Sequence, residues 1–202
     1  MKITVLAASG RTGLELVRQA LRRGHTVTAI ARDPQRIAVP DSARLHKVAG
    51  DVDEPGSIAA AIDAGAVVLS ALGTERAGVL TAGARAVLAA GPGRVIWLGA
   101  YGTGRSAKAA GPAAEKFGAL LGDRLADKVM ADGAVLAAGG TVVHAGLLGD
   151  DPESPSRRTV GLTDAPPLDL AEKISRATVA AVMLDEAETP RFEGTVAVAL
   201  SA

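Results

Sequence analysis

The sequence predicts an α/β fold built on one doubly wound parallel sheet, with helices on both faces and a short carboxy-terminal appendix. Short apolar runs alternate with helical patterns along nearly the whole chain. Some of these runs, such as residues 66–72, are continuously apolar, as expected for strands buried on both faces. Parallel strands need crossovers, and the intervening helices supply them.

The individual elements follow from spacing and from the residues at their ends. In the first expected helix, Leu14, Val17 and Leu21 recur at i, i+3 and i+7, and Gly24 ends the pattern. Strands are expected at 2–7, 26–31, 44–51, 66–72, 94–100, 141–148, near Thr159–Leu162 and at 193–200. Helices are expected at 11–24, 54–65, 81–91, 122–139 and 169–187.

Residues 150–168 differ from the rest of the chain, because they contain four prolines and no helical period. Apart from the short strand near Thr159–Leu162, they are expected to form an irregular loop that covers the active site.

Composition narrows the class of protein. The 202 residues are 48% apolar, which suits a single domain spanning 1–202 with one core. Lys plus Arg and Asp plus Glu are 22 each, so we expect neither a nucleic-acid nor a membrane partner. The absence of cysteine excludes thiolate catalysis and fits a cytoplasmic protein. Both a monomer and a homodimer agree with this composition.

The segment Val5–Gly13, "VLAASGRTG", lies between the first strand and the first helix. A dinucleotide-binding turn uses one glycine for tightness, a second for approach to the pyrophosphate and a third for close helix packing. Gly10 and Gly13 fill the second and third roles, while Ala7 stands in the first and is acceptable if its φ is negative. Chance is the alternative, since 24 residues are glycine. The context favours a cofactor loop.

The end of the second strand bears on the choice of cofactor. NAD-binding sites place Asp or Glu there to hold the ribose 2′-hydroxyl. Here Ala31 closes the strand and Arg32 follows, and a guanidinium suits a 2′-phosphate. Arg11 is expected to assist, and Asp33 is the competing acid. We therefore expect NADPH, with NADH less favoured.

The segments "ASGRTG", "VTAIARDP" and "VAGDVDEPGSIAAAIDAGAVVLSALGT" resemble the atypical short-chain dehydrogenases of the NAD(P)H-binding, NmrA-like group. The resemblance implies a Rossmann fold over the whole chain. It also implies roles for individual residues. Gly10, Arg11, Thr12 and Gly13 contact the pyrophosphate, and Ala7 and Ser9 complete their loop. Arg32 binds the 2′-phosphate, and Asp51 and Val52 flank the adenine. Ala71, Leu72 and Gly73 line the ribose and nicotinamide, and His144 to Leu147 cover the nicotinamide.

The chain departs from this group where catalysis is expected. The Tyr-x-x-x-Lys pair is missing, because Tyr101 has Arg105 at the fourth position after it. The fifth strand often ends in Ser or Thr in the group, but here it ends in Gly99 and Ala100, before Tyr101. The frequent Arg-Pro after the sixth strand is replaced by His144-Ala145.

Three side chains are candidates for the chemistry. Tyr101 is the first, as a donor beside the substrate, and a packing role is the alternative. Lys128 matches a lysine of the group, and a solvated surface lysine is its alternative. His144 has a suitable pKa for proton transfer, and a hydrogen-bonded core histidine is its alternative. Other polar residues expected at this edge are Ser70, Thr74, Thr103 and Ser106.

No metal site is expected, because the three histidines are scattered and His25 and His46 flank strands at the expected surface. The sequence therefore favours an NADPH-dependent oxidoreductase that reduces a small organic substrate, such as a flavin, a quinone, an enone or a ketone. Two alternatives remain open. One is a non-catalytic NADP(H)-sensing regulatory protein, and the other is an NAD(P)-dependent epimerase or isomerase.

Overall fold

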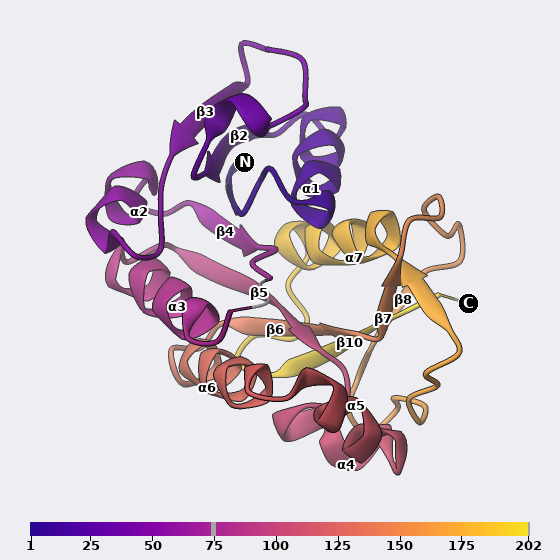
Figure 1. The fold of residues 1–202 in the computed structure, drawn as a ribbon. Coiled ribbons are helices and arrows are strands. Elements are labelled where there is room, and N and C mark those ends of the chain that lie inside the picture. Colours follow the sequence, from indigo (N-terminus) through magenta and orange to yellow (C-terminus); the bar gives the residue numbers. More distant parts are fainter. Residues whose placement is uncertain (74–75, 202) are drawn as a thin grey trace.

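The computed structural model describes residues 1–73 and 76–201, and Figure 1 shows their arrangement. The strands are β1 Lys2–Leu6, β2 Thr26–Ala31, β3 Leu45–Ala49, β4 Val67–Ser70, β5 Arg94–Ala100, β6 Thr141–Ala145, β7 Leu147–Gly149, β8 Arg158–Gly161, β9 Lys173–Ser175 and β10 Val196–Leu200. The helices are α1 Arg11–Arg22, α2 Pro55–Ala61, α3 Val79–Ala89, α4 Ala107–Ala110, α5 Ala113–Leu121, α6 Arg124–Ala137 and α7 Arg176–Glu188, with 3₁₀ turns η1 Pro34–Arg36 and η2 Gly104–Ser106.

Within the described residues, eight strands form one sheet in the order β3-β2-β1-β4-β5-β6-β10-β8. All neighbours pair in parallel except β8, which runs antiparallel to β10. The order reverses between β1 and β4, and this switch point is where doubly wound folds bind their ligands. The predicted fold class is confirmed: this is a Rossmann-type α/β fold.

Helices α1 and α7 cover one face of the sheet, and α2, α3 and α6 cover the other (Figure 1). Alternate strand residues face two separate cores, one on each side of the sheet. On one side, Val5 of β1 and Ile96 of β5 pack against α1 and α7. On the other, Leu6 and Trp97 pack against α2, α3 and α6. This double burial explains why the strand sequences are continuously apolar.

Two expected elements differ most from the structure in their bounds. The helix expected over 169–187 begins only at Arg176, because the Ser175 hydroxyl accepts the Thr178 N–H as an N-cap. The preceding residues form β9. The strand expected over 141–148 ends at Ala145, and after Gly146 the chain continues as β7, which pairs with β9 in a separate two-stranded sheet.

Helices α4 and α5 lie in a part of the chain for which the sequence analysis assigned no element. They bring Phe117 and Leu121 against Ala100 at the end of β5. Across the described ranges, no helix combines the length and apolar character needed to cross a bilayer.

Candidate cofactor and substrate site

The turn between β1 and α1 is shaped to receive an anion. Gly10 is the N-cap of α1 in an extended conformation, and within the described chain no side chain caps this helix. The first turn of α1 carries no acidic residue. Its N–H groups and partial positive charge therefore remain available to a phosphate. A Cβ on Gly13 would lie 2.2 Å from the Ala7 carbonyl oxygen, so only glycine allows this approach of helix and strand.

Ala7 adopts a φ of +62°, so the condition of a negative φ, under which alanine would be acceptable here, is not met. The turn imposes this conformation, because the Ala7 carbonyl accepts the Gly10 N–H at 3.0 Å while the Ala8 N–H donates to Ile30 at 2.9 Å. Ala7 is the only non-glycine residue with positive φ in the described ranges. The left-handed region costs alanine about 1–2 kcal/mol, so this turn is strained.

A pocket of about 300 Å³ lies beyond the carboxyl ends of the strands, next to this turn. It contains most of the residues expected around the adenine half of a dinucleotide. The residues lining it are Leu6, Ala7, Ser9, Gly10, Ile30, Ala31, Arg32, Arg36, Gly50, Asp51, Val52, Leu72, Gly73, Arg76 and Val79. Thr12 and Gly13 are buried behind the turn, and Ala71 and Leu147 lie outside this lining.

Two guanidinium groups stand at the rim of this cofactor pocket without a counter-charge. Arg32 and Arg36 are exposed, and in the described part of the chain neither forms an ion pair. Asp33, the competing acid, turns away, because its carboxylate accepts the Gln35 N–H and caps η1. The sequence analysis missed Arg36. The signal that could have identified it is its position within η1, four residues after Arg32.

Arg76 is a third cation of the cofactor pocket that the sequence analysis missed. Its guanidinium donates to Asp53 at 2.7 Å, and this hydrogen bond raises the pKa of Arg76. Thr74, a sequence-based candidate at this edge, lies outside the described residues.

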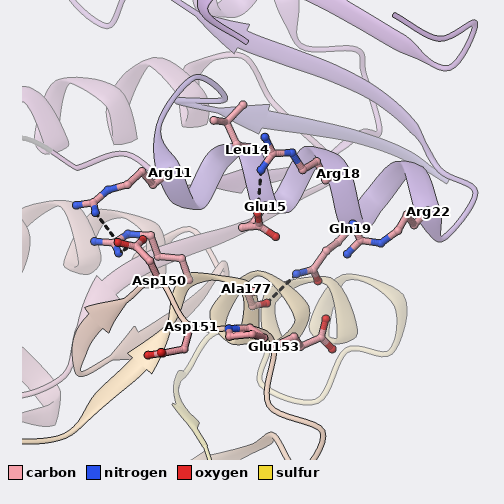
Figure 2. A pocket seen from close by; sticks show the side chains of 12 residues that line it. Arg11, Leu14, Glu15, Arg18, Gln19, Arg22, Asp150, Asp151, Glu153 and Ala177 are labelled. Atoms are coloured by element: carbon pink, nitrogen blue, oxygen red, sulfur yellow. Dashed lines mark hydrogen bonds and ion pairs between the residues drawn. The ribbon is translucent and has the colours of Figure 1, made fainter. Parts of the chain in front are cut away.

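Arg11 does not point along the turn as expected. Its guanidinium donates to Asp150 at 2.7 Å, and Asp150 also accepts from Arg176 at 2.6 Å (Figure 2). These residues belong to a separate pocket of about 470 Å³ between α1 and the start of α7. Its described lining holds four arginines and four carboxylates, so the charges balance. In this structure the Arg11 guanidinium is therefore paired with Asp150.

His144 lies in a buried hydrogen-bonded network rather than at an open surface. It is 1% exposed, its Nδ1 lies 2.7 Å from Ser106 Oγ, and its Nε2 lies 3.0 Å from Asp132 Oδ2. Because a carboxylate only accepts, the Nε2–H donates to Asp132. The network joins β6, α6 and the η2 turn across the carboxyl edge of the sheet.

The contact between Gly99 and His144 explains two departures from the family pattern, the glycine at the end of β5 and the histidine in β6. Gly99 is directly opposite His144 in the β5–β6 register. A Cβ on Gly99 would lie 2.5 Å from His144 Cδ2 and 2.6 Å from Nε2. Serine or threonine at position 99 would therefore displace the imidazole, so His144 and Gly99 depend on each other.

The set Ser106, Asp132 and His144 has the chain order of an α/β-hydrolase triad, but it lacks the exposure that nucleophilic attack needs. Ser106 is fully buried, accepts the Gly102 N–H at 2.9 Å and lies 3.0 Å from the Thr103 carbonyl oxygen. The three residues line neither the cofactor pocket nor a pocket of about 370 Å³ beside Tyr101, which Gly146 and Leu200 also line. The network therefore supports the turn after β5.

The other candidates for catalysis are also engaged. Tyr101 is 3% exposed and donates its hydroxyl to the Pro166 carbonyl at 2.6 Å, while burial raises the pKa of its phenol. A phenol bound in this way is not a free donor, contrary to expectation. Lys128 is half-buried on α6 and lines neither the cofactor pocket nor the pocket beside Tyr101.

The histidines at the strand flanks differ from one another. His25 is not a surface residue as expected, since it is 8% exposed and bonds to Glu188 at 2.7 Å. His46 is exposed, as expected. Among the residues described, no three histidine, aspartate or glutamate side chains gather in a way that would hold a metal ion.

This fold and the β1–α1 turn define a class, the dinucleotide-binding Rossmann proteins. Comparison with known proteins supports the same class. A family model described as NAD(P)H-binding matches residues 7–190. The chain belongs to this family. A curated relative, the uncharacterized protein YwnB of Bacillus subtilis, is 45% identical over 47 residues, and this match covers 23% of the chain and 22% of YwnB.

Solved structures share the whole fold at low sequence identity. The oxidoreductase ylbE of Lactococcus lactis is 19% identical with a TM-score of 0.81, covering 100% of this chain and 91% of its own. The anaerobilin reductase ChuY of Escherichia coli O157:H7 is 19% identical with a TM-score of 0.79, covering 100% and 97%. A short-chain dehydrogenase/reductase of Veillonella parvula in complex with NADP is 19% identical with a TM-score of 0.77, covering 98% and 93%.

Proposed function

We propose that this protein is an NADPH-dependent reductase of a small organic substrate. The observation that carries the choice of NADPH is the pair Arg32 and Arg36, which stand without counter-charge at the rim of the cofactor pocket. A 2′-phosphate accepts hydrogen bonds from two such forks. The acid that would favour NADH, Asp33, is occupied in capping η1.

The residues present fit the dinucleotide. The uncapped N-terminus of α1 suits the pyrophosphate, and Gly13 leaves the room that the turn requires. Asp51, Val52, Leu72 and Gly73 line the same pocket. The chemistry that bound NADPH supplies is a hydride, which carries two electrons and one proton to the substrate, and water supplies the second proton.

The remaining residues of the carboxyl edge orient the reactants rather than exchange protons. Tyr101 and His144 already hold their hydrogen bonds within the protein. This arrangement favours substrates that hydride transfer converts into a stable anion, such as a quinone, which becomes a hydroquinone monoanion that water then protonates, over simple ketones. The same observation also favours the second candidate function, an NADP(H)-binding sensor without turnover.

The test is to incubate the protein with NADPH and with a panel of flavins, quinones, enones and ketones while absorbance of the reduced nicotinamide is followed. Turnover of any member supports the reductase. Tight NADPH binding with no consumption across the panel would favour the sensor, and transfer of hydride back to the substrate, seen as isomerisation without net oxidation, would favour the epimerase.

A further inference from the structure

A third pocket, of about 370 Å³, opens at the same edge of the sheet as the cofactor pocket but beside other strands. Tyr101 follows β5, Gly146 follows β6, and Leu200 ends β10. Of these strands, β5 neighbours β4, and Leu72 and Gly73, which follow β4, line the cofactor pocket. The two pockets together extend along one edge, as a dinucleotide followed by its substrate would.

We propose that this third pocket, which we call the Tyr101 pocket, receives the substrate and selects uncharged quinones of one or two rings. The proposal rests on the reductase function proposed above and narrows it to a substrate class. Three properties of the pocket carry it: the apolar walls, the charge at the mouth and the volume.

The walls are predominantly apolar. Pro166, Pro167 and Leu168 form one side, and Ile174 and Leu200 contribute others. A ligand here exchanges water for carbon surface, which is favourable by about 25 cal/mol for each Å² of apolar area. These wall side chains offer a ligand few hydrogen-bonding groups and no metal-binding group. The pocket therefore suits a compact ligand with a flat, apolar ring system.

The charges at the mouth disfavour anions. Asp169, Glu172 and Lys173 line the pocket and are exposed, which gives two negative charges and one positive charge, or a net charge of −1. A flavin phosphate or a carboxylate-bearing pigment would meet this excess of negative charge. An uncharged quinone would not.

The volume sets the size limit. About 370 Å³ lies near the small end of the range of roughly 300–1,000 Å³ that small-molecule pockets span. One or two fused rings fit within it, whereas a whole flavin nucleotide would extend beyond it.

Tyr101 shapes this pocket as a positioning residue. Its hydroxyl bond to the Pro166 carbonyl holds the Pro166–Leu168 segment against the end of β5, and the backbone N–H of Leu168 donates to Ala110 at 3.0 Å. Because burial raises the pKa of Tyr101, its phenol stays protonated and keeps this bond throughout the neutral range. The quinone gains two electrons and one proton as hydride, and water gives the second proton to the hydroquinone oxygen.

The experiment measures calorimetric binding of 1,4-naphthoquinone to the protein, alone and with NADP⁺, together with NADPH consumption. The absence of cysteine removes thiol adducts as an interfering reaction. Leu168→Trp fills the pocket and should lower both naphthoquinone affinity and kcat/KM at least about tenfold. The matched control, Leu120→Trp, alters a leucine that is 68% exposed on α5 and should change neither.

Two further variants keep the test decisive if Leu168→Trp does not fold. Leu168→Ala should raise the rate with the three-ring 9,10-phenanthrenequinone relative to naphthoquinone. The double variant Asp169→Asn, Glu172→Gln should raise affinity for 1,4-naphthoquinone-2-sulfonate about fivefold and leave the uncharged quinone unchanged.

The outcomes separate this inference from the reductase proposal. Quinone turnover that none of these variants alters would overturn the Tyr101 pocket as the substrate site and leave the reductase standing. Quinone binding that responds to the variants, with no NADPH consumption, would retain the pocket and overturn the reductase. Preference of the wild type for the sulfonate over the uncharged quinone would overturn the substrate class.

Discussion

The two halves of the sheet differ in where their polar groups are satisfied. At the ends of β1 and β2, the α1 N–H groups and the Arg32 and Arg36 guanidinium groups face a pocket without protein partners in the described ranges. At the ends of β5 and β6, Tyr101, Ser106 and His144 bond to other protein groups. The polar groups of the first half are available to a charged ligand, whereas those of the second half stabilise the protein's own conformation.

This difference shows that the family's dinucleotide site can be kept while its catalytic side chains are replaced. The chain keeps the turn and the cation that recognise a cofactor, while a histidine–aspartate network fills the place where the related pattern has Ser or Thr. Specificity in the second half then depends on the walls of the Tyr101 pocket.

The first prediction concerns the turn that carries the first half. Gly13→Ala places a Cβ 2.2 Å from backbone, which cannot move as a side chain would. We expect a loss of about 3 kcal/mol in unfolding free energy, at the upper end of overpacking effects, and no measurable NADPH binding. Urea denaturation and calorimetry measure both.

Gly56→Ala is the matched control for this change, since a Cβ there meets nothing within 4 Å and Gly56 lies in α2. It should be neutral or slightly stabilising. Equal behaviour of the two variants would contradict the close approach of α1 and β1.

The second prediction concerns the buried network of the second half. Asp132→Asn removes the charge that pairs with His144 and should cost about 2–3 kcal/mol of unfolding free energy. NADPH affinity should change less than about twofold, since the network lies outside the cofactor pocket. Loss of NADPH consumption at unchanged stability would instead make His144 a catalytic residue.

The third prediction concerns Asp127, which joins α6 to the start of α3. Burial alone raises the pKa of Asp127, but hydrogen bonds from the Thr81 hydroxyl and from the Thr81, Leu80 and Gly78 N–H groups outweigh it, so this pKa lies below its ordinary value of 3.8. Asp127→Asn should cost about 1 kcal/mol near pH 7.

The sign of the pH dependence follows from this lowered pKa. The stabilisation by Asp127 is fully present above the pKa of the unfolded chain and is lost as pH falls through the folded pKa. The gap in unfolding free energy between wild type and variant should therefore close in acid. Asp123→Asn, an exposed neighbour, should show no gap. A gap that widened in acid would contradict the capping role.

The smallest expected effect is at Ala7. Ala7→Gly relieves a φ of +62° and should raise the free energy of unfolding by about 0.5–1 kcal/mol, which corresponds to a Tm increase of about 1–4 °C. NADPH affinity should be preserved. Destabilisation by this substitution would show that the alanine methyl packs more favourably than the backbone strain costs.

Much of the fold could be predicted from the sequence, because continuous apolar runs and helical spacing identify buried strands and covering helices. The start of α7 could not be predicted, since the hydroxyl of its N-cap residue, Ser175, decides where this helix begins. At the site, Arg32 followed from its place after β2. The partnership of Gly99, Asp132 and His144 could not be read from sequence, because it depends on strand register and on a helix far along the chain.

The central claim is that the first half recognises NADPH through Arg32 and Arg36. Calorimetry should compare NADPH and NADH binding to the wild type, to Arg32→Ala and Arg36→Ala, and to Arg44→Ala as an exposed control. We expect the wild type to bind NADPH about 100-fold more tightly than NADH, each pocket variant to lose at least about tenfold for NADPH alone, and the control to lose nothing. Equal wild-type affinities, or equal losses for both nucleotides, would contradict the claim.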